Sequence, residues 1–115
     1  MAITLASQNA LSLTTGAKSA EQVVGRLAYV GKGRVQLTAK ASAAAATGIR
    51  CSLNVGGTPL MDDQYIPWAG TTGTMSTKDN MIIDQVVAGG YVSLTFRNDS
   101  AGTLTTDYIL TFTPM

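Results

Sequence analysis

The sequence predicts an all-β domain, and three observations lead to that prediction. Apolar and polar residues alternate in several short runs, and a period of two places every second side chain on one face of a strand. Turn-forming clusters rich in Gly, Asn and Asp separate these runs at intervals of about 8 to 15 residues. No convincing long helical pattern interrupts them. We therefore expect an antiparallel β-sandwich or small barrel of about seven to eight strands.

The N-terminal part of the chain gives the weakest pattern. Apolar residues recur along residues 1–16, so we expect an N-terminal arm or edge strand there. Residues 17–24 (AKSAEQVV) are the only plausible helical turn, with Ser19 as a candidate N-cap. We expect residues 17–115 to form a single β-sandwich domain, since 115 residues suit one core.

A hairpin is predicted around the first glycine pair of the chain. Gly31-Lys32-Gly33 interrupts two strand-like runs, residues 26–30 and 34–42, and a three-residue loop containing Gly is a hairpin signal. The prediction places Val30 opposite Arg34. The second run alternates apolar residues with polar and basic ones, so we expect one apolar face and one basic face.

The centre of the chain is predicted less sharply. Residues 49–55 alternate as a strand that ends at a Gly-Gly turn, and residues 43–48 before them are expected to form a loop. Residues 60–66 are less regular, and the polar residues 70–80 suggest a long connection. Residues 81–87 return to strand character.

The strongest strand pattern lies at the C-terminal end. Residues 92–97 and 104–112 both alternate, and the cluster Asn98-Asp99-Ser100-Ala101-Gly102 between them suits a hairpin loop. We predict that Arg97 pairs with Thr103 across this loop. In that register the apolar rows share one face, and the other face is rich in Thr and interrupted only by Ile109.

Composition excludes most enzyme chemistry. Charged residues are 13% of the chain, against about 25% in an average domain. The chain has no His and a single Cys, so Ser-His-Asp and Cys-His arrangements and His- or CxxC-based zinc sites cannot be built. Cys51 falls on the apolar side of its strand and is expected to be a small buried side chain. We expect that the protein is not an enzyme and needs no metal or other cofactor.

Charge is distributed unevenly along the chain. Residues 1–50 contain six basic residues and one acidic residue, and residues 51–115 contain two basic and six acidic ones. The hairpin predicted above would place Arg26, Arg34 and Lys40 on one sheet face. One interpretation is contact with nucleic-acid phosphates; the other is an ordinary solvated face. The candidate nucleic-acid-binding residues are Arg26, Lys32, Arg34, Lys40 and Arg50.

Two other kinds of site have weaker support. Loop aspartates such as Asp62 and Asp63 could coordinate Ca²⁺, but their spacing matches no calcium-binding loop. A role in turn formation explains them better. Trp68, Tyr65 and Tyr91 could form an aromatic platform for sugars, which keeps a carbohydrate or cell-surface binding module open. The alternative for Trp68 is a core or interface anchor.

The low charge also indicates assembly. A neutral surface rich in small side chains suits burial against copies of the same chain, so we expect a homo-oligomer. No apolar run approaches the roughly 18 residues of a membrane span, and no basic segment precedes an apolar run as in a signal peptide. We expect synthesis in the cytoplasm, no membrane partner and no small-molecule substrate.

The closing unit of the chain resembles small viral structural proteins, with bacteriophages as the first candidates. The resemblance rests on residues 86–104 (VVAGGYVSLTFRNDSAGTL) and 108–114 (YILTFTP), and it extends loosely over residues 34–85. It implies a jelly-roll-like sandwich that acts as a capsid or coat protein and self-assembles into a virion shell. The shells that such proteins form are icosahedral. It also implies that basic residues face packaged nucleic acid. A capsid decoration protein is the alternative within the same class.

Overall fold

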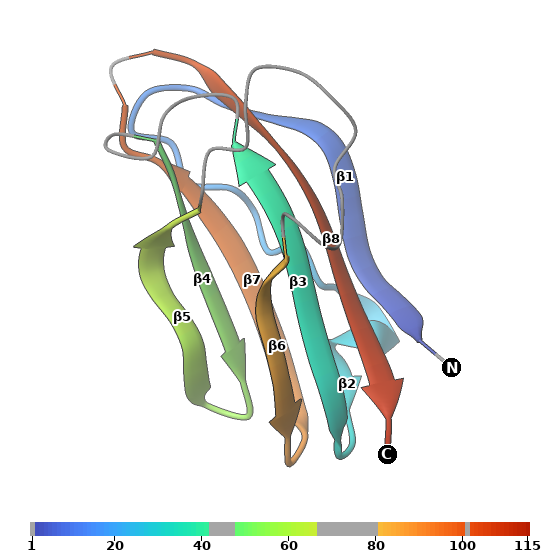
Figure 1. The fold of residues 1–115 in the computed structure, drawn as a ribbon. Coiled ribbons are helices and arrows are strands. Elements are labelled where there is room, and N and C mark those ends of the chain that lie inside the picture. Colours follow the sequence, from blue (N-terminus) through green and yellow to red (C-terminus); the bar gives the residue numbers. More distant parts are fainter. Residues whose placement is uncertain (1, 42–47, 67–80, 101) are drawn as a thin grey trace.

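The structure is a computed structural model that describes residues 2–41, 48–66, 81–100 and 102–115 (Figure 1). The strands are β1 (Ile3–Leu13), β2 (Tyr29–Val30), β3 (Gly33–Ala41), β4 (Ile49–Val55), β5 (Thr58–Tyr65), β6 (Met81–Val87), β7 (Gly90–Asn98) and β8 (Leu104–Pro114), and the short 3-10 helix η1 (Gly25–Ala28) precedes β2. They form two four-stranded antiparallel sheets packed face to face, which confirms the all-β sandwich predicted from the alternation.

The strand order is that of a jelly roll. One sheet has the order β1-β8-β3-β6 and the other has the order β2-β7-β4-β5. The first sheet pairs β1 with β8 and β3 with β6, and the second sheet pairs β2 with β7 and β4 with β5. The chain is therefore one long antiparallel hairpin, with its tip at the β4–β5 turn, that has rolled up into two layers. Figure 1 shows β3 and β8 in front of β4 and β7.

The core lies between the two sheets and follows the alternation of the strands. In β4 the buried and half-buried residues alternate strictly, and β7 shows the same pattern over most of its length. The central apolar residues of β3 and β8 complete the packing from the other layer. The largest fully buried apolar side chains are Val23, Val35, Leu37, Ile49, Leu53, Ile66, Val92, Leu94, Phe96, Tyr108 and Leu110. The faces predicted for residues 35–41, 49–55 and 92–96 are confirmed.

The predicted C-terminal hairpin is wrong. Strands β7 and β8 are consecutive in the sequence but belong to different sheets, so Arg97 does not pair with Thr103. The two apolar rows meet across the core, and the rings of Phe96 and Tyr108 lie 4.9 Å apart between centroids. Alternation predicted the buried face of each strand correctly. It could not distinguish a neighbour in the same sheet from a neighbour in the opposite layer.

The crossing between the sheets is organised by the side chain of Asn98, which is fully buried. Its Nδ2 donates hydrogen bonds to the carbonyl oxygens of Leu13 and Gly102, both at 2.8 Å. Its Oδ1 accepts from the backbone N–H and the hydroxyl of Ser100, at 2.8 and 2.7 Å. One amide therefore satisfies polar groups of both sheets at the point where the chain changes layer.

The predicted hairpin at Gly31–Gly33 is also wrong. Strand β2 pairs with β7, whereas β3 pairs with β6 and β8, so Val30 does not lie opposite Arg34. This short link is a second crossing between the layers. The common basic face expected for Arg26, Arg34 and Lys40 depended on the hairpin, and it has no basis in the observed pairing.

The helical turn predicted for residues 17–24 is replaced by an extended segment along the free edge of β7. Ser19 is not an N-cap: its N–H donates to the Phe96 carbonyl, and its hydroxyl accepts from the Phe96 N–H. The Glu21 carboxylate accepts from the Leu94 N–H and the Ser93 hydroxyl. Side chains thus supply part of the ladder that a regular strand would make with its backbone.

The remaining strands are β1, β5 and β6. Strand β1 lies at the edge of its sheet, next to β8. Residues 81–87 form the predicted strand, and residues 58–65 form a strand where only an irregular segment was expected. Residues 43–47, predicted as part of a loop, and residues 70–80, predicted as a connection, lie outside the described residues.

Candidate functional site

A row of charged side chains crosses three strands on the outer face of the β2-β7-β4-β5 sheet. Arg50 of β4 is the register partner of both Arg97 on β7 and Tyr65 on β5. Asp63 on β5 and Asp99, which directly follows β7, complete the group. We call these five residues the ion-pair cluster.

The cluster is closed by short, directional contacts. Arg97 donates two hydrogen bonds to the Asp63 carboxylate, from Nε at 3.2 Å and from Nη2 at 2.7 Å. Arg50 pairs with Asp99 at 3.1 Å and with Asp63 at 3.5 Å. The hydroxyl of Tyr65 donates to Asp99, while the Arg50 guanidinium lies 4.2 Å from the Tyr65 ring centroid. Two-nitrogen contacts and cation–π stacking fix the geometry more firmly than a single exposed ion pair does.

A β-bulge places the central carboxylate of the cluster. The pairing of β4 with β5 shifts between Cys51 and Leu53, so two residues of β5 lie opposite Ser52 alone. Asp63 is the one described residue other than glycine with a positive φ, 50°, and its N–H donates to the Ser52 hydroxyl oxygen at 3.0 Å. A bulge re-aims a side chain at the expense of regular pairing. Here it turns the Asp63 carboxylate toward both arginines.

The arginines hold the carboxylates in their ionised form. The hydrogen bonds from Arg97, with the nearby charges of Arg97 and Arg50, lower the pKa of Asp63 below its ordinary value. The hydrogen bond from Tyr65 and the contacts with Arg50 lower the pKa of Asp99 in the same direction. At neutral pH the cluster contains two full negative charges and two full positive charges.

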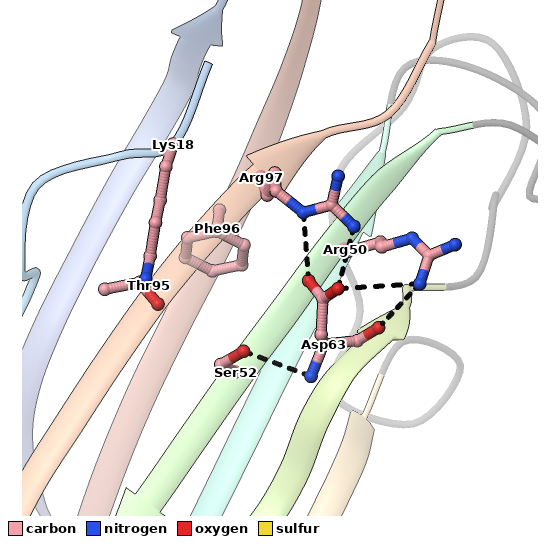
Figure 2. Close-up of a pocket in the computed structure, with 7 residues that line it drawn as sticks. All are labelled: Lys18, Arg50, Ser52, Asp63, Thr95, Phe96 and Arg97. Atoms are coloured by element: carbon pink, nitrogen blue, oxygen red, sulfur yellow. Dashed lines mark hydrogen bonds and ion pairs between the residues drawn. The ribbon is translucent and has the colours of Figure 1, made fainter. Parts of the chain in front are cut away.

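A polar cavity of about 230 Å³ lies beside the cluster (Figure 2). It is lined by Lys18, Arg50, Ser52, Asp63, Thr95, Phe96 and Arg97. Figure 2 shows Lys18 and Thr95 on one side, Asp63 between the two arginines on the other, and Ser52 near the Asp63 backbone. Three of the lining side chains are cationic and one is anionic, so the cavity has an excess of positive charge.

The structure does not bring the five predicted nucleic-acid-binding residues together. Arg34 and Lys40 lie on β3, where they pair with Asp84 at 2.5 Å and Asp107 at 3.9 Å. Arg50 is in the other sheet, within the ion-pair cluster. Arg26 belongs to η1, and Lys32 is exposed in the link between β2 and β3. The predicted set therefore spreads over both layers.

A patch of exposed apolar side chains lies at the edge of the same sheet. It consists of Val24, Leu27, Tyr29 and Tyr91, which we call the β2-edge patch. Val24 is 68% exposed and Tyr29 is 71% exposed. The rings of Tyr29 and Tyr91 meet edge to face at 5.1 Å, as expected from their direct pairing between β2 and β7. Sequence reasoning missed this patch because β2 is too short to show alternation.

The aromatic platform predicted from Trp68, Tyr65 and Tyr91 is not assembled from its two described members. Tyr65 lies level with Arg97, six residues along β7 from Tyr91, which corresponds to about 20 Å. Tyr65 also has its hydroxyl and its ring engaged by the ion-pair cluster. Trp68 lies outside the described residues.

Cys51 is a core residue, and potential metal ligands do not gather among the described residues. Burial raises the pKa of the Cys51 thiol to about 12, so the thiol is protonated at neutral pH, as expected for a packed core residue. Within the described ranges, no group of three or more potential metal ligands comes together. In the same ranges, no helix has the length and apolar character needed to cross a bilayer.

Comparison with known proteins adds no relative. No model of a known family matches the chain, and no curated protein matches it either. Function has to be argued from the geometry.

Proposed function

We propose that the protein is a viral structural protein, a capsid or coat subunit that self-assembles into a virion shell. The eight-stranded jelly roll supports this proposal, because that architecture recurs in viral shells as well as in lectins and cupins. Fold alone does not assign a function, so the argument rests on the surfaces.

The β2-edge patch is the observation that carries the proposal. The four apolar side chains, which lie on β2, beside it on β7 and shortly before it in the chain, are 45 to 71% exposed, and a second copy that covered them would shield them from water. The patch lies at a sheet edge, because β2 is the outermost strand of its sheet and consists of two residues. Burial of such side chains contributes about 25 cal/mol per Å² of apolar area.

The outer face of the β1-β8-β3-β6 sheet supports close packing of copies. Its Arg34 and Lys40 are both paired with carboxylates, so the net charge of these pairs is zero. Along β8 the half-buried Thr111 and Thr113 and the exposed Ile109 contribute uncharged surface. A neutral face lacks the long-range repulsion that keeps strongly charged proteins apart. Because these cations are paired, the proposal does not assign nucleic-acid contact to this face.

Size-exclusion chromatography with light scattering tests the proposal. We expect the recombinant protein to elute as an assembly many times the 11.9 kDa subunit mass. Val24→Ser, inside the patch, should shift the equilibrium toward free subunits, and Val86→Ser, on β6 outside the patch and also exposed, serves as the matched control. Wild-type protein that stays monomeric at high concentration would refute shell formation and favour a decoration protein.

A carbohydrate-binding module is the second candidate, favoured by the exposed Tyr29–Tyr91 pair. Exposed aromatic rings provide stacking faces for sugars. One variant distinguishes the two candidates. If the protein is a coat subunit, Tyr29→Ser should weaken assembly. If it is a binding module, the protein should be monomeric and Tyr29→Ser should weaken glycan binding.

A further inference from the structure

We propose that the cavity beside the ion-pair cluster is a binding site for a phosphate group. This inference stands on the cavity itself and does not depend on shell assembly. It assigns Lys18 as the binding cation, with the hydroxyls of Ser52 and Thr95 as further donors.

Charge balance identifies Lys18 as the binding group. Within the cluster the two arginines are matched by the carboxylates of Asp63 and Asp99, at distances between 2.7 and 3.7 Å. Lys18 lines the same cavity, and it forms no ion pair with any residue that the structure describes. The cavity and its rim therefore hold one positive charge in excess. An anion that enters would neutralise it.

Two hydroxyl groups can add a second and a third contact to a phosphate bound at Lys18. Ser52 and Thr95 are direct cross-strand partners on β4 and β7, and both line the cavity. The Ser52 oxygen already accepts a hydrogen bond from the Asp63 N–H, so its own proton is available to donate. Lys18 and Thr95 both line the cavity, so an ammonium and a hydroxyl border the same space.

The walls of the cavity are held in place before a ligand arrives. The backbone of Lys18 is bridged to β7 opposite Arg97, and the next residue, Ser19, exchanges hydrogen bonds with Phe96. On the other side the bulge fixes Asp63, and Asp63 fixes Arg97 through two contacts. A site whose groups are already ordered loses less conformational entropy on binding.

Size and donor type favour phosphate over a larger or planar ligand. A cavity of about 230 Å³ is smaller than the roughly 300 to 1,000 Å³ of sites for drug-sized molecules, so it suits a single group with some water. Both arginines already engage carboxylates, which leaves a compact ammonium and two hydroxyls. A point charge with separate hydroxyl donors suits a tetrahedral oxyanion, whereas a planar carboxylate is bound best by a free guanidinium.

Equilibrium dialysis with radiolabelled inorganic phosphate tests the site, because it works whether or not the protein assembles. We expect saturable binding at neutral pH and constant ionic strength, with one phosphate per chain. Lys18→Met should weaken binding by about tenfold or more, since it removes a charged hydrogen-bond donor. Lys32→Met, which removes an exposed lysine in the link between β2 and β3 that does not line the cavity, should leave binding unchanged.

Two further ligands distinguish the possible sources of the phosphate. A single-stranded oligonucleotide that binds with the same dependence on Lys18 would identify phosphodiesters as the ligand, with affinity that falls as salt rises. Binding of inorganic phosphate alone would identify a free phosphate group. The inference is overturned if neither binds, if Lys18→Met binds as wild type does, or if acetate competes as well as phosphate. Light scattering on the same samples reports assembly separately.

Discussion

The buried amide of Asn98 is predicted to be the most sensitive polar side chain in the fold. Replacement by Ala removes both Nδ2 hydrogen bonds, to the carbonyls of Leu13 and Gly102, and the acceptor for Ser100. Each such bond contributes about 1 kcal/mol net, and a buried carbonyl left without a partner costs about 1 kcal/mol or more. The free energy of unfolding should therefore fall by about 3 kcal/mol.

Urea unfolding followed by far-UV circular dichroism measures this loss. With an m-value of about 1 to 3 kcal/mol/M, the midpoint should move down by about 1 to 3 M. Asn54→Ala is the matched control, because Asn54 lies on the outer side of β4, is half-buried and makes no side-chain hydrogen bond to a described residue. It should change stability by no more than about 0.5 kcal/mol.

A third variant separates the donor from the acceptor. Asn98→Asp keeps an acceptor for Ser100 but turns a carboxylate toward two carbonyl oxygens. It should be at least as unstable as the Ala variant at neutral pH and should recover part of its stability in acid, where a protonated carboxyl can donate. If Asn98→Ala unfolds at the same urea concentration as Asn54→Ala, the amide does not hold the crossing between the sheets, and our reasoning about it is refuted.

Three further perturbations test the core, the ion-pair cluster and one close backbone approach. Burial raises the pKa of Cys51 from 9.0 to about 12, so unfolded chains lose this proton first and the free energy of unfolding should fall as pH rises above about 9, by up to about 1.4 kcal/mol per pH unit. Cys51→Ala should flatten that slope in unfolding curves between pH 8 and 10.5, and an unchanged slope would contradict the assignment. Arg97 lowers the pKa of Asp63 in the folded protein. The ion pair therefore stabilises the fold fully above the unfolded carboxyl pKa of about 4, and this stabilisation is lost as the pH falls through the lowered pKa of the folded state. Asp63→Asn, which tolerates the positive φ, should be less stable than wild type at pH 7 and converge with it in acid; a constant difference down to pH 2 would count against the ion pairs. A Cβ on Gly33 would lie 2.5 Å from an aromatic ring atom and from a backbone oxygen, so Gly33→Ala should destabilise the fold by about 1 to 3 kcal/mol in thermal unfolding. Gly31→Ala meets nothing within 4 Å, and equal melting temperatures for the two variants would show that this contact is relaxed.

Alternation in the sequence was enough to predict which side chains are buried. Val35, Cys51 and Leu94 each belong to a run with period two, and each is fully buried. The pattern records only local geometry, so it carries no information about which strand lies alongside. Strands β7 and β8 could bury the same residues as a hairpin in one sheet or as opposing strands in two, and a buried Asn98 is what distinguishes the second arrangement.

The candidate site was less accessible to sequence reasoning. Arg50 was named as a candidate cation, but its partners depend on the register between β4, β5 and β7 and on a bulge at Asp63. A bulge shifts every later residue of its strand to the other face of the sheet. Nothing in the alternation of residues 58–65 indicates that a bulge is present. Lys18 was expected in a helical turn, so its position beside β7 could not be anticipated.

Electron microscopy of the purified protein tests the self-assembly proposal most directly. The described subunit measures 40 Å along its longest axis, so a shell and a free subunit differ unmistakably in size. We predict closed particles of uniform diameter many times that length, and fewer of them for Val24→Ser than for Val86→Ser. A field of single subunits under every condition of protein concentration and salt would contradict the proposal that this jelly roll is a coat subunit.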